Sequence, residues 1–275
     1  MQLDKLCVAC FSPTHTSMKI ARAIADGTRI ARREEIDLTT DPADTPISVR
    51  NAICIVAAPV YGGLVAPVAV RRIARLRAEN SIAIPVVVYG NRDYEDALVQ
   101  LRDLLHAQGF TPLCGAAFVG EHSYSTPGTP IAEGRPDAQD LAEATAFGAR
   151  IGQKLAHGET RPIDAAKLRE PHTPLLSKLR FIRFVLGYRR RQKRNPVALL
   201  PAGDATRCTQ CGRCVALCPT QAIARGDELH TDPARCIRCC ACVKGCAFGA
   251  RTFETPFAAV LSRNFARRKP PVTLM

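Results

Sequence analysis

The sequence contains no Trp, and aromatic residues make up only 5% of its 275 positions. It has no apolar run long enough to span a bilayer, and its N-terminus lacks the apolar segment and small-residue cleavage site of an exported precursor. No G-x-G-x-x-G fingerprint follows any predicted strand, which argues against a separate dinucleotide-binding domain. We therefore expect no membrane span, no export and a core of small aliphatic side chains.

Charge is unevenly distributed along the chain, whose formal net charge is +13. Residues 1–160 carry 16 Lys and Arg against 18 Asp and Glu, whereas residues 161–275 carry 22 against 7. A length of 275 residues fits two domains of unequal size. The basic character therefore belongs to the C-terminal part.

Eight of the 13 cysteines form two runs with one C-x2-C-x2-C-x3-C spacing: Cys208, Cys211, Cys214 and Cys218, then Cys236, Cys239, Cys242 and Cys246. In this spacing three thiolates hold one [4Fe-4S] cluster, and the fourth reaches the other cluster of a pair. The rule assigns cluster one to Cys208, Cys211, Cys214 and Cys246, and cluster two to Cys236, Cys239, Cys242 and Cys218. Disulfides would require an oxidising compartment, and a triple run suits a tetrahedral zinc site poorly.

The two runs resemble the bacterial two-cluster ferredoxin, which implies a small α+β domain over residues 201–255. Since low-potential clusters require a reducing interior, we expect a cytoplasmic protein. Cys240 lies between two ligands and is interpreted as a spectator. The four remaining cysteines lie in predicted strands and are interpreted as buried structural thiols: Cys7, Cys10, Cys54 and Cys114.

Strands and helices alternate over the first 157 residues. Strands are predicted at 3–11, 29–38, 52–58, 84–90 and 113–120, and helices at 18–26, 65–79, 94–108 and 137–156. Such alternation predicts a doubly wound parallel sheet, with ligands beyond the carboxyl ends of its strands. Three loops converge there, at residues 12–17, 59–63 and 90–95.

Residues 1–157 resemble flavodoxin, which implies strand order 2-1-3-4-5 and bound FMN. The resemblance implies phosphate contacts from Ser12, Thr14, Thr16 and Ser17, with His15 at a position that is usually glycine. It further implies that the loop Pro59, Val60, Tyr61, Gly62 and Gly63 edges the flavin. The third loop, with Gly90, Asn91, Arg92 and Tyr94, would place Tyr94 on the ring, with Tyr61 as second choice. His122 and Tyr124 are candidates for the flavin edge. Taken singly, each loop is also compatible with an ordinary helix cap or turn.

Residues 158–200 form a basic, partly helical linker, and residues 256–275 a C-terminal tail. The linker mixes apolar and cationic residues around the run Arg189 to Arg194. We interpret it mainly as a helix that packs between the domains; an acidic redox partner is the next choice, and weak peripheral membrane association stays open. No dedicated nucleic-acid binding is expected.

The order of parts resembles prokaryotic flavodoxin-ferredoxin fusions. This resemblance implies an electron-transfer protein that passes electrons between FMN and two [4Fe-4S] clusters and links one-electron and two-electron partners. The redox partner would be an acidic ferredoxin or a flavoprotein. An FMN-dependent reductase acting on a nicotinamide or small substrate is the alternative, with the clusters as an internal wire.

Overall fold

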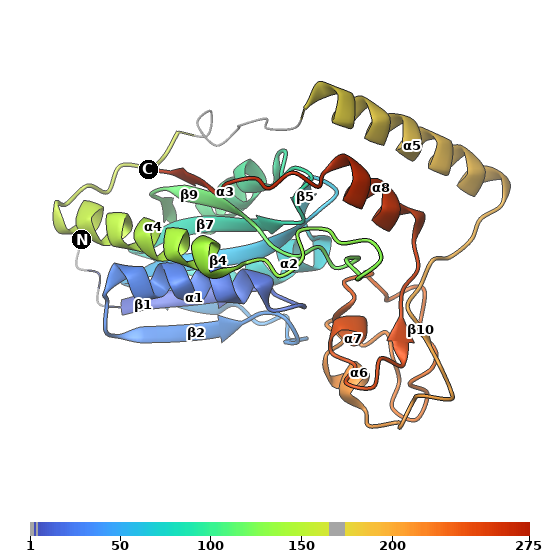
Figure 1. Cartoon of the computed structure of the whole chain (residues 1–275). Coiled ribbons are helices and arrows are strands. Elements are labelled where there is room, and N and C mark those ends of the chain that lie inside the picture. Colours follow the sequence, from blue (N-terminus) through green and yellow to red (C-terminus); the bar gives the residue numbers. More distant parts are fainter. Residues whose placement is uncertain (1–2, 4, 165–173) are drawn as a thin grey trace.

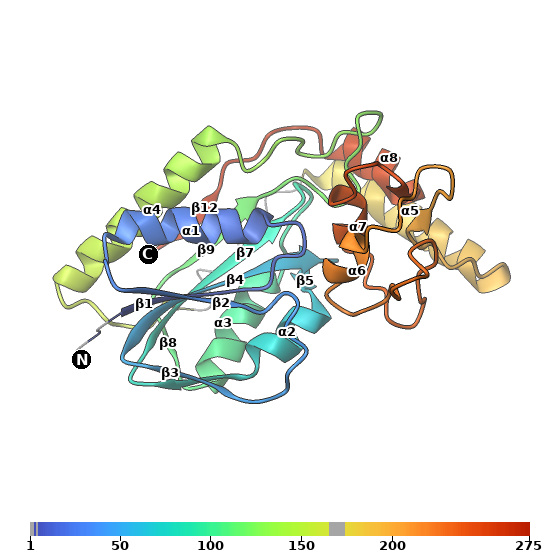
Figure 2. The ribbon, with the colours of Figure 1, turned by 90° about the horizontal axis from the view of Figure 1, so that it is seen from below.

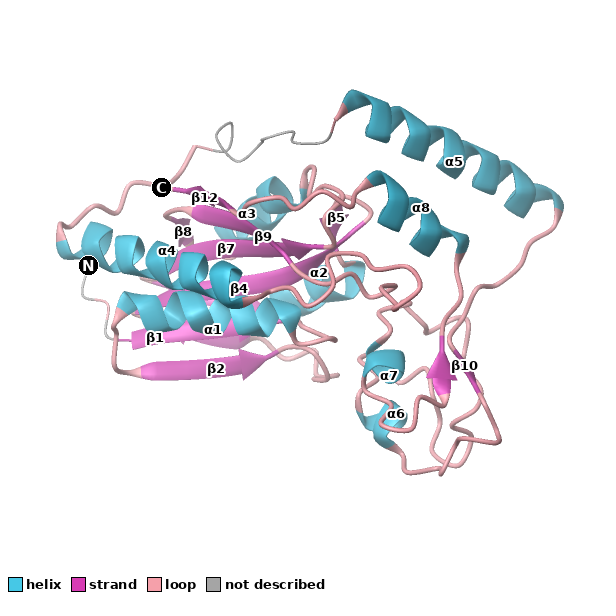
Figure 3. Cartoon of the chain, viewed as in Figure 1, coloured by secondary structure: helices cyan, strands magenta, loops and turns pink. Residues whose placement is uncertain are grey.

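The computed structural model describes residue 3, residues 5–164 and residues 174–275. Its centre is a parallel sheet in the order β2-β1-β4-β7-β9, visible in Figures 1 and 3. These strands are β1 (Lys5–Cys10), β2 (Arg33–Asp37), β4 (Ala52–Tyr61), β7 (Ile82–Tyr89) and β9 (Gly115–Val119). Counting only these five, the order is 2-1-3-4-5, so the predicted doubly wound fold is confirmed.

Helices cover both faces of this sheet (Figure 2). One face carries α1 (Thr16–Thr28) and α4 (Ala138–Ala156), and the other carries α2 (Pro67–Ile73) and α3 (Ala97–Ala107). Helices α1 and α4 pack closely because small residues lie at their contact. A Cβ on Gly148 of α4 would lie 1.9 Å from the carbonyl oxygen of Ile24 in α1. The core on both sides is rich in Ala, Val and Ile, as the composition predicts.

Short strands extend the predicted pattern. The helix expected over 65–79 ends at Ile73, and β6 (Leu76–Glu79) then pairs in parallel with β3 (Ile47–Arg50). Two further pairings are β5 (Leu64–Val65) with β4 and β8 (Thr111–Pro112) with β7. The helical spacing was misleading here because the pairing of β6 depends on a partner segment about 30 residues upstream.

The last twenty residues, expected from sequence as a C-terminal tail, return to the first domain. They form α8 (Pro256–Asn264) and then β12 (Val272–Leu274), which pairs antiparallel with the edge strand β9 (Figure 1). The Asn91 amide donates to the carbonyl oxygens of Phe265 and Arg267, at 2.6 and 2.9 Å. The tail is therefore part of the first domain's edge.

The cysteine-rich region is small and internally repeated. It contains α6 (Arg213–Ala216), α7 (Ala241–Lys244) and the antiparallel pair β10 (Ala202–Gly203) and β11 (Arg251–Thr252). Cys240 has a positive φ of 57°, at the position where the first motif has Gly212 with φ 72°.

Helix α5 (Leu175–Arg194) lies beside α8, as Figure 1 shows. The expected linker is thus helical over most of its described part, and its residues 165–173 lie outside the described residues. In the part of the chain that the structure describes, no helix combines the length and apolar character needed to cross a membrane.

Candidate functional site

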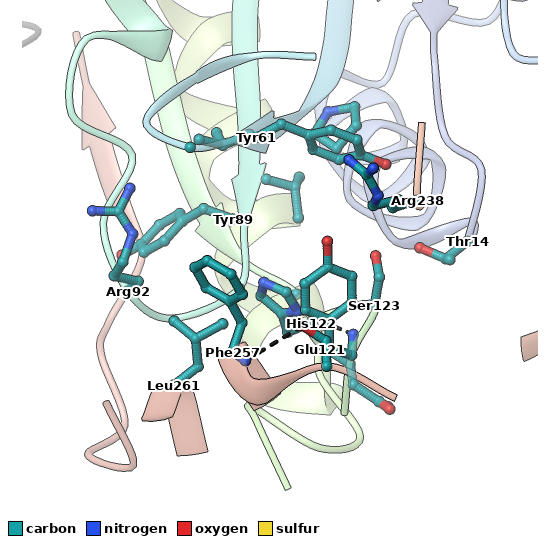
Figure 4. A pocket seen from close by; sticks show the side chains of 18 of the residues that line it. Thr14, Tyr61, Tyr89, Arg92, Glu121, His122, Ser123, Arg238, Phe257 and Leu261 are labelled. Carbon is teal, nitrogen blue, oxygen red and sulfur yellow. Dashed lines mark hydrogen bonds between the residues drawn. The ribbon is translucent and has the colours of Figure 1, made fainter. Parts of the chain in front are cut away.

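A cavity of about 530 Å³ lies at the carboxyl ends of β1, β4, β7 and β9 (Figure 4). The three predicted loops meet there, together with the segment after β9. Of the residues predicted to bind FMN, the cavity is lined by Ser12, Thr14, Thr16, Ser17, Pro59, Val60, Tyr61, Gly62, Gly63, Gly90 and Arg92. Its volume lies within the range of small-molecule sites, about 300–1,000 Å³.

The first loop is shaped as an anion site. His15 caps α1 in the left-handed region, with φ 64°, and its exposed side chain stays outside the cavity lining. The Ser12 hydroxyl accepts a hydrogen bond from the Met18 amide at 3.1 Å. Among the described residues, the buried Ser17 hydroxyl has no hydrogen-bond partner. The first amides of α1 also lack intrahelical acceptors, so an anion here would gain several donors.

Two predicted residues of the third loop serve the scaffold instead. Tyr94 is 2% exposed and packs in the core against Tyr89, with ring centroids 5.5 Å apart. Asn91 is buried and holds the C-terminal tail. The structure therefore does not place Tyr94 where it could stack on a ligand in the cavity; Tyr89 and Tyr61 lie in its wall.

His122 and Tyr124 both line the cavity, as expected. The His122 Nδ1 accepts a hydrogen bond from the Tyr124 amide at 3.0 Å. Burial, with smaller effects from the charges of Arg92 and Lys244, lowers the pKa of His122 to about 4. The ring is therefore neutral near pH 7, with its proton on Nε2. A Cβ on Gly90 would lie 2.2 Å from the His122 ring, so glycine is required for this approach.

The outer wall of the cavity comes from residues that sequence patterns missed. Helix α5 contributes Phe181 and Tyr188, and α8 contributes Phe257 and Leu261 (Figure 4). These aromatic rings pack together, with centroids 5.0 Å apart for Tyr188 and Phe257. The spacing of aromatic residues at 181, 184 and 188 signals a buried helical face, but it does not reveal what that face covers.

The eight motif cysteines gather into two quartets around separate small cavities. One is lined by Cys208, Cys211, Cys214 and Cys246, and the other by Cys218, Cys236, Cys239 and Cys242. The spacing assigns the same two sets as ligands, and their ligation of clusters stays a prediction. In the described part of the chain, no group of three or more His, Cys, Asp or Glu side chains is arranged to hold a single metal ion. Each quartet instead surrounds a hollow, an arrangement that fits a cluster.

Backbone amides point at sulfur in both quartets. The Ala222 amide donates to Cys218 Sγ and the Ala250 amide to Cys246 Sγ, each at 3.2 Å. Such bonds stabilise thiolate charge and tune cluster potentials. They occupy equivalent positions in the two motifs, which is further evidence of the internal repeat.

Comparison with protein families matches residues 201–247 to the 4Fe-4S dicluster domain. The chain therefore carries a 4Fe-4S dicluster domain behind a flavodoxin-like fold. The fold assignment rests on the strand order of the sheet. A dicluster domain implies electron transfer between redox partners.

Among solved structures, the first domain is similar to a flavodoxin from the domain Archaea, with 14% identity and a TM-score of 0.35, over 56% of this chain and 99% of that one. It is similar to the flavodoxin of Streptococcus pneumoniae TIGR4, with 17% identity and a TM-score of 0.37, over 55% and 99%. It is also similar to rubredoxin oxygen:oxidoreductase from Desulfovibrio gigas, with 15% identity and a TM-score of 0.38, over 56% and 36%. Among curated proteins, no sequence matches this chain.

One quartet of the dicluster domain adjoins the cavity, and we call it the inner quartet: Cys218, Cys236, Cys239 and Cys242. Arg238, within its motif, lines the cavity wall beside Tyr61 (Figure 4). Burial, followed by nearby thiol charge at Cys239, raises the pKa of Tyr61. The Tyr124 ring lies 5.1 Å from that of Phe253.

Polar contacts fix the seam between the two domains. Lys244 Nζ contacts Glu121 Oε1 at 2.6 Å and the Ser125 carbonyl oxygen at 2.8 Å. Arg72 donates to the carbonyl oxygen of Pro219, the residue after Cys218, at 2.6 Å. Both contacts involve the inner-quartet side of the dicluster domain. The remaining cysteines, Cys208, Cys211, Cys214 and Cys246, form the outer quartet.

Proposed function

We propose that the chain is an electron-transfer iron-sulfur flavoprotein, with FMN in the cavity and a [4Fe-4S] cluster at each quartet. FMN, when bound, exchanges electrons singly or in pairs, whereas each cluster exchanges one, so the protein would link one-electron and two-electron partners. The observation that carries the proposal is the shared wall: Arg238, between Cys236 and Cys239 of the inner quartet, lines the cavity beside Tyr61 (Figure 4). Such proximity raises the effective concentration of one carrier at the other.

The chemistry of the cavity fits FMN at both ends. The Ser17 hydroxyl and the first amides of α1 offer donors for a phosphate, beside the hydroxyls of Thr14 and Thr16. Aromatic and aliphatic side chains at the other end suit a flat ring system. Neutral His122 carries a proton on Nε2 and would serve as a donor that adds no charge.

A binding comparison of FMN with riboflavin tests the phosphate site. We expect the reconstituted chain to bind FMN about 100-fold or more tighter, because charge-assisted hydrogen bonds contribute about 1.5–3 kcal/mol each. The double variant Thr16→Val and Ser17→Ala should remove most of the difference, as flavin fluorescence quenching would show. The control Thr145→Val, on the exposed side of α4, should bind like the parent. Equal affinity for FMN and riboflavin in the parent chain would contradict the assignment.

Dithionite and NADPH distinguish the carrier from the reductase. Phe181, Tyr188 and Phe257 line the outer wall of the cavity, which favours exchange within the chain over docking of a nicotinamide ring. In an anaerobic visible spectrum we expect dithionite, and not NADPH, to bleach flavin and cluster absorbance. Bleaching by NADPH would favour the reductase hypothesis. A spectrum with cluster absorbance but no flavin bands would contradict the assignment of FMN to the cavity.

The outer quartet is the proposed contact with an acidic redox protein. Its cavity includes Arg213, and the Arg207 and Arg225 guanidinium groups lie near the motif backbone, by Gly249 and Gly212. A cationic rim steers acidic partners and makes association depend on ionic strength. A reducing compartment such as the cytoplasm is the setting that we propose for this chemistry.

A further inference from the structure

Helix α5 has two apolar faces, of which one packs on other residues of the described chain. Phe181, Phe184 and Tyr188 pack on α8, where ring centroids lie 5.1 Å apart for Phe184 and Phe257. Arg92 adds a cation over the Phe181 ring at 5.2 Å. These contacts seat the helix on the body of the protein and fix which side faces outward.

The outward side carries a second apolar row, which we call the apolar stripe: Leu175, Leu179, Ile182 and Leu186. Its members follow one another at intervals of four, three and four residues, so they share one face of the helix. They are between 43% and 69% exposed, unusually high for large aliphatic side chains in a row. These exposed fractions show that the described chain leaves the apolar stripe largely uncovered. Helix α5 lies at the edge of the ribbon in Figure 1.

Cations border the apolar stripe on both sides. Helical periodicity puts Lys178 and Arg189 along one edge, and Arg183 and Arg190 along the other. The helix contains eight Lys and Arg residues and no Asp or Glu. This symmetric arrangement matches a flat anionic surface, whereas a protein groove would have to supply acids along both of its rims.

We infer that α5 docks the protein on an anionic phospholipid surface. The apolar stripe would enter the boundary between headgroups and acyl chains, while the bordering cations reach outward to lipid phosphates. The helix is already held by its aromatic face, so docking requires little ordering of the chain. Eight cations oppose burial of α5 across a bilayer, and they suit a helix that lies in the interface plane. This inference is independent of the flavin assignment.

Vesicle sedimentation of the full-length, cluster-loaded chain tests the inference. We expect binding to vesicles that contain phosphatidylglycerol, weakened by salt, and little binding to phosphatidylcholine alone. The double variant Arg183→Gln and Arg190→Gln should lower affinity about 30-fold, since each cation near such a surface contributes about a factor of five. The double variant Leu179→Gln and Leu186→Gln should lower it about tenfold or more, because it removes the apolar anchor. Glutamine is a good helix former, so α5 should persist in both.

The charge-matched control Lys19→Gln and Arg32→Gln removes two exposed cations from the first domain. It should bind vesicles like the parent chain if α5 is the docking element. Equal losses in the control and in the Arg183 and Arg190 variant would overturn the inference, as would absent binding of the parent. A homodimer that is lost in the leucine variant would identify a second copy of the chain as the occupant of the apolar stripe and overturn the inference. Retention of the parent chain on polyglutamate without vesicle binding would identify an acidic protein and overturn it as well.

Discussion

The inner and outer quartets share one spacing but have different surroundings. In the inner quartet Cys239 and Cys242 are each 8% exposed, and burial raises the pKa of these thiols to about 12 and about 11. In the outer quartet Cys211 is exposed, and backbone amides outweigh burial to hold the pKa of Cys246 below its ordinary value. The motif thus determines which cysteines come together, while the neighbouring domain determines how exposed each quartet is to solvent.

We propose that this contrast divides the two cluster sites by role. In the inner quartet Cys239 and Cys242 are buried, and Arg72 of the first domain donates to the carbonyl oxygen of Pro219, next to Cys218. The outer quartet lies beside Phe248, which is 49% exposed. A site for exchange within the chain and a site for exchange with another protein require these two environments.

Replacement of one ligand in each quartet should remove one cluster and leave the other. The crossed ligation predicted from the spacing requires that Cys218→Ser match Cys239→Ser, although the two cysteines lie in different motifs, and that Cys246→Ser match Cys211→Ser. Iron should fall from about eight to about four atoms per chain in each variant. Electron paramagnetic resonance of the reduced protein should show the same remaining signal within each pair. A match of Cys218→Ser with Cys211→Ser would contradict the crossed arrangement.

The outer cluster should be lost first to a chelator. Exposure of Cys211 gives iron chelators and ferricyanide direct access, whereas the first domain shields the inner quartet. We expect biphasic bleaching near 400 nm (about half of the absorbance in each phase), with the fast phase absent from Cys211→Ser. The Cys239→Ser variant, as the matched control, should keep only the fast phase. A single phase in the parent chain would show that the two environments do not differ in access.

Sequence patterns predicted much of this architecture, because its signals are local. The cysteine spacing contains the crossed pairing, and alternating elements with strong apolar strands give the parallel sheet. The position of the cavity could be predicted from the three loops that follow β1, β4 and β7, because the carboxyl ends of parallel strands lie at one edge of the sheet. Each of these inferences depends on residues that lie close together in the chain.

Long-range contacts account for what sequence patterns could not show. Strand β12 has three residues, too few for a periodic signal, and forms only because β9 presents a free edge. Tyr94 has the side chain of a stacking residue, but its loop turns that ring into the core. Phe257 lines the cavity together with Tyr61, although the two residues lie nearly 200 positions apart in the sequence, and no local pattern predicts that arrangement. The different exposure of the two quartets likewise depends on long-range contacts, here with the first domain.

The partly buried ring of His122 should make the free energy of unfolding depend on pH. Its pKa falls from 6.5 to about 4 on folding, so below pH 6.5 the unfolded state takes up more protons than the folded state. Stability is therefore lost as pH falls from about 6.5 to about 4. Since the ring is only half-buried, we expect about 1–2 kcal/mol between pH 7 and pH 5. Urea unfolding at the two pH values measures this loss.

The variant His122→Asn provides the control for this titration. Asparagine keeps an acceptor near the position of Nδ1 for the Tyr124 amide but takes up no proton. The difference between pH 7 and pH 5 should shrink by the predicted amount. An unchanged difference would assign the pH dependence to other groups.

The smallest expected effect concerns the seam that keeps the inner quartet dry. Lys244→Met removes the ion pair with Glu121 and the contact with the Ser125 carbonyl oxygen. Because this pair is about one-third exposed, its loss should cost about 1 kcal/mol or less in unfolding experiments. A looser seam should nevertheless admit chelator to the inner quartet and narrow the gap between the two bleaching phases. The control Arg235→Met breaks an exposed ion pair with Asp232 inside the dicluster domain, makes no change at the contact with Glu121, and should leave both phases unchanged. If the two variants behave alike, the dryness of the inner quartet comes from packing around Tyr124 and Phe253 rather than from this ion pair.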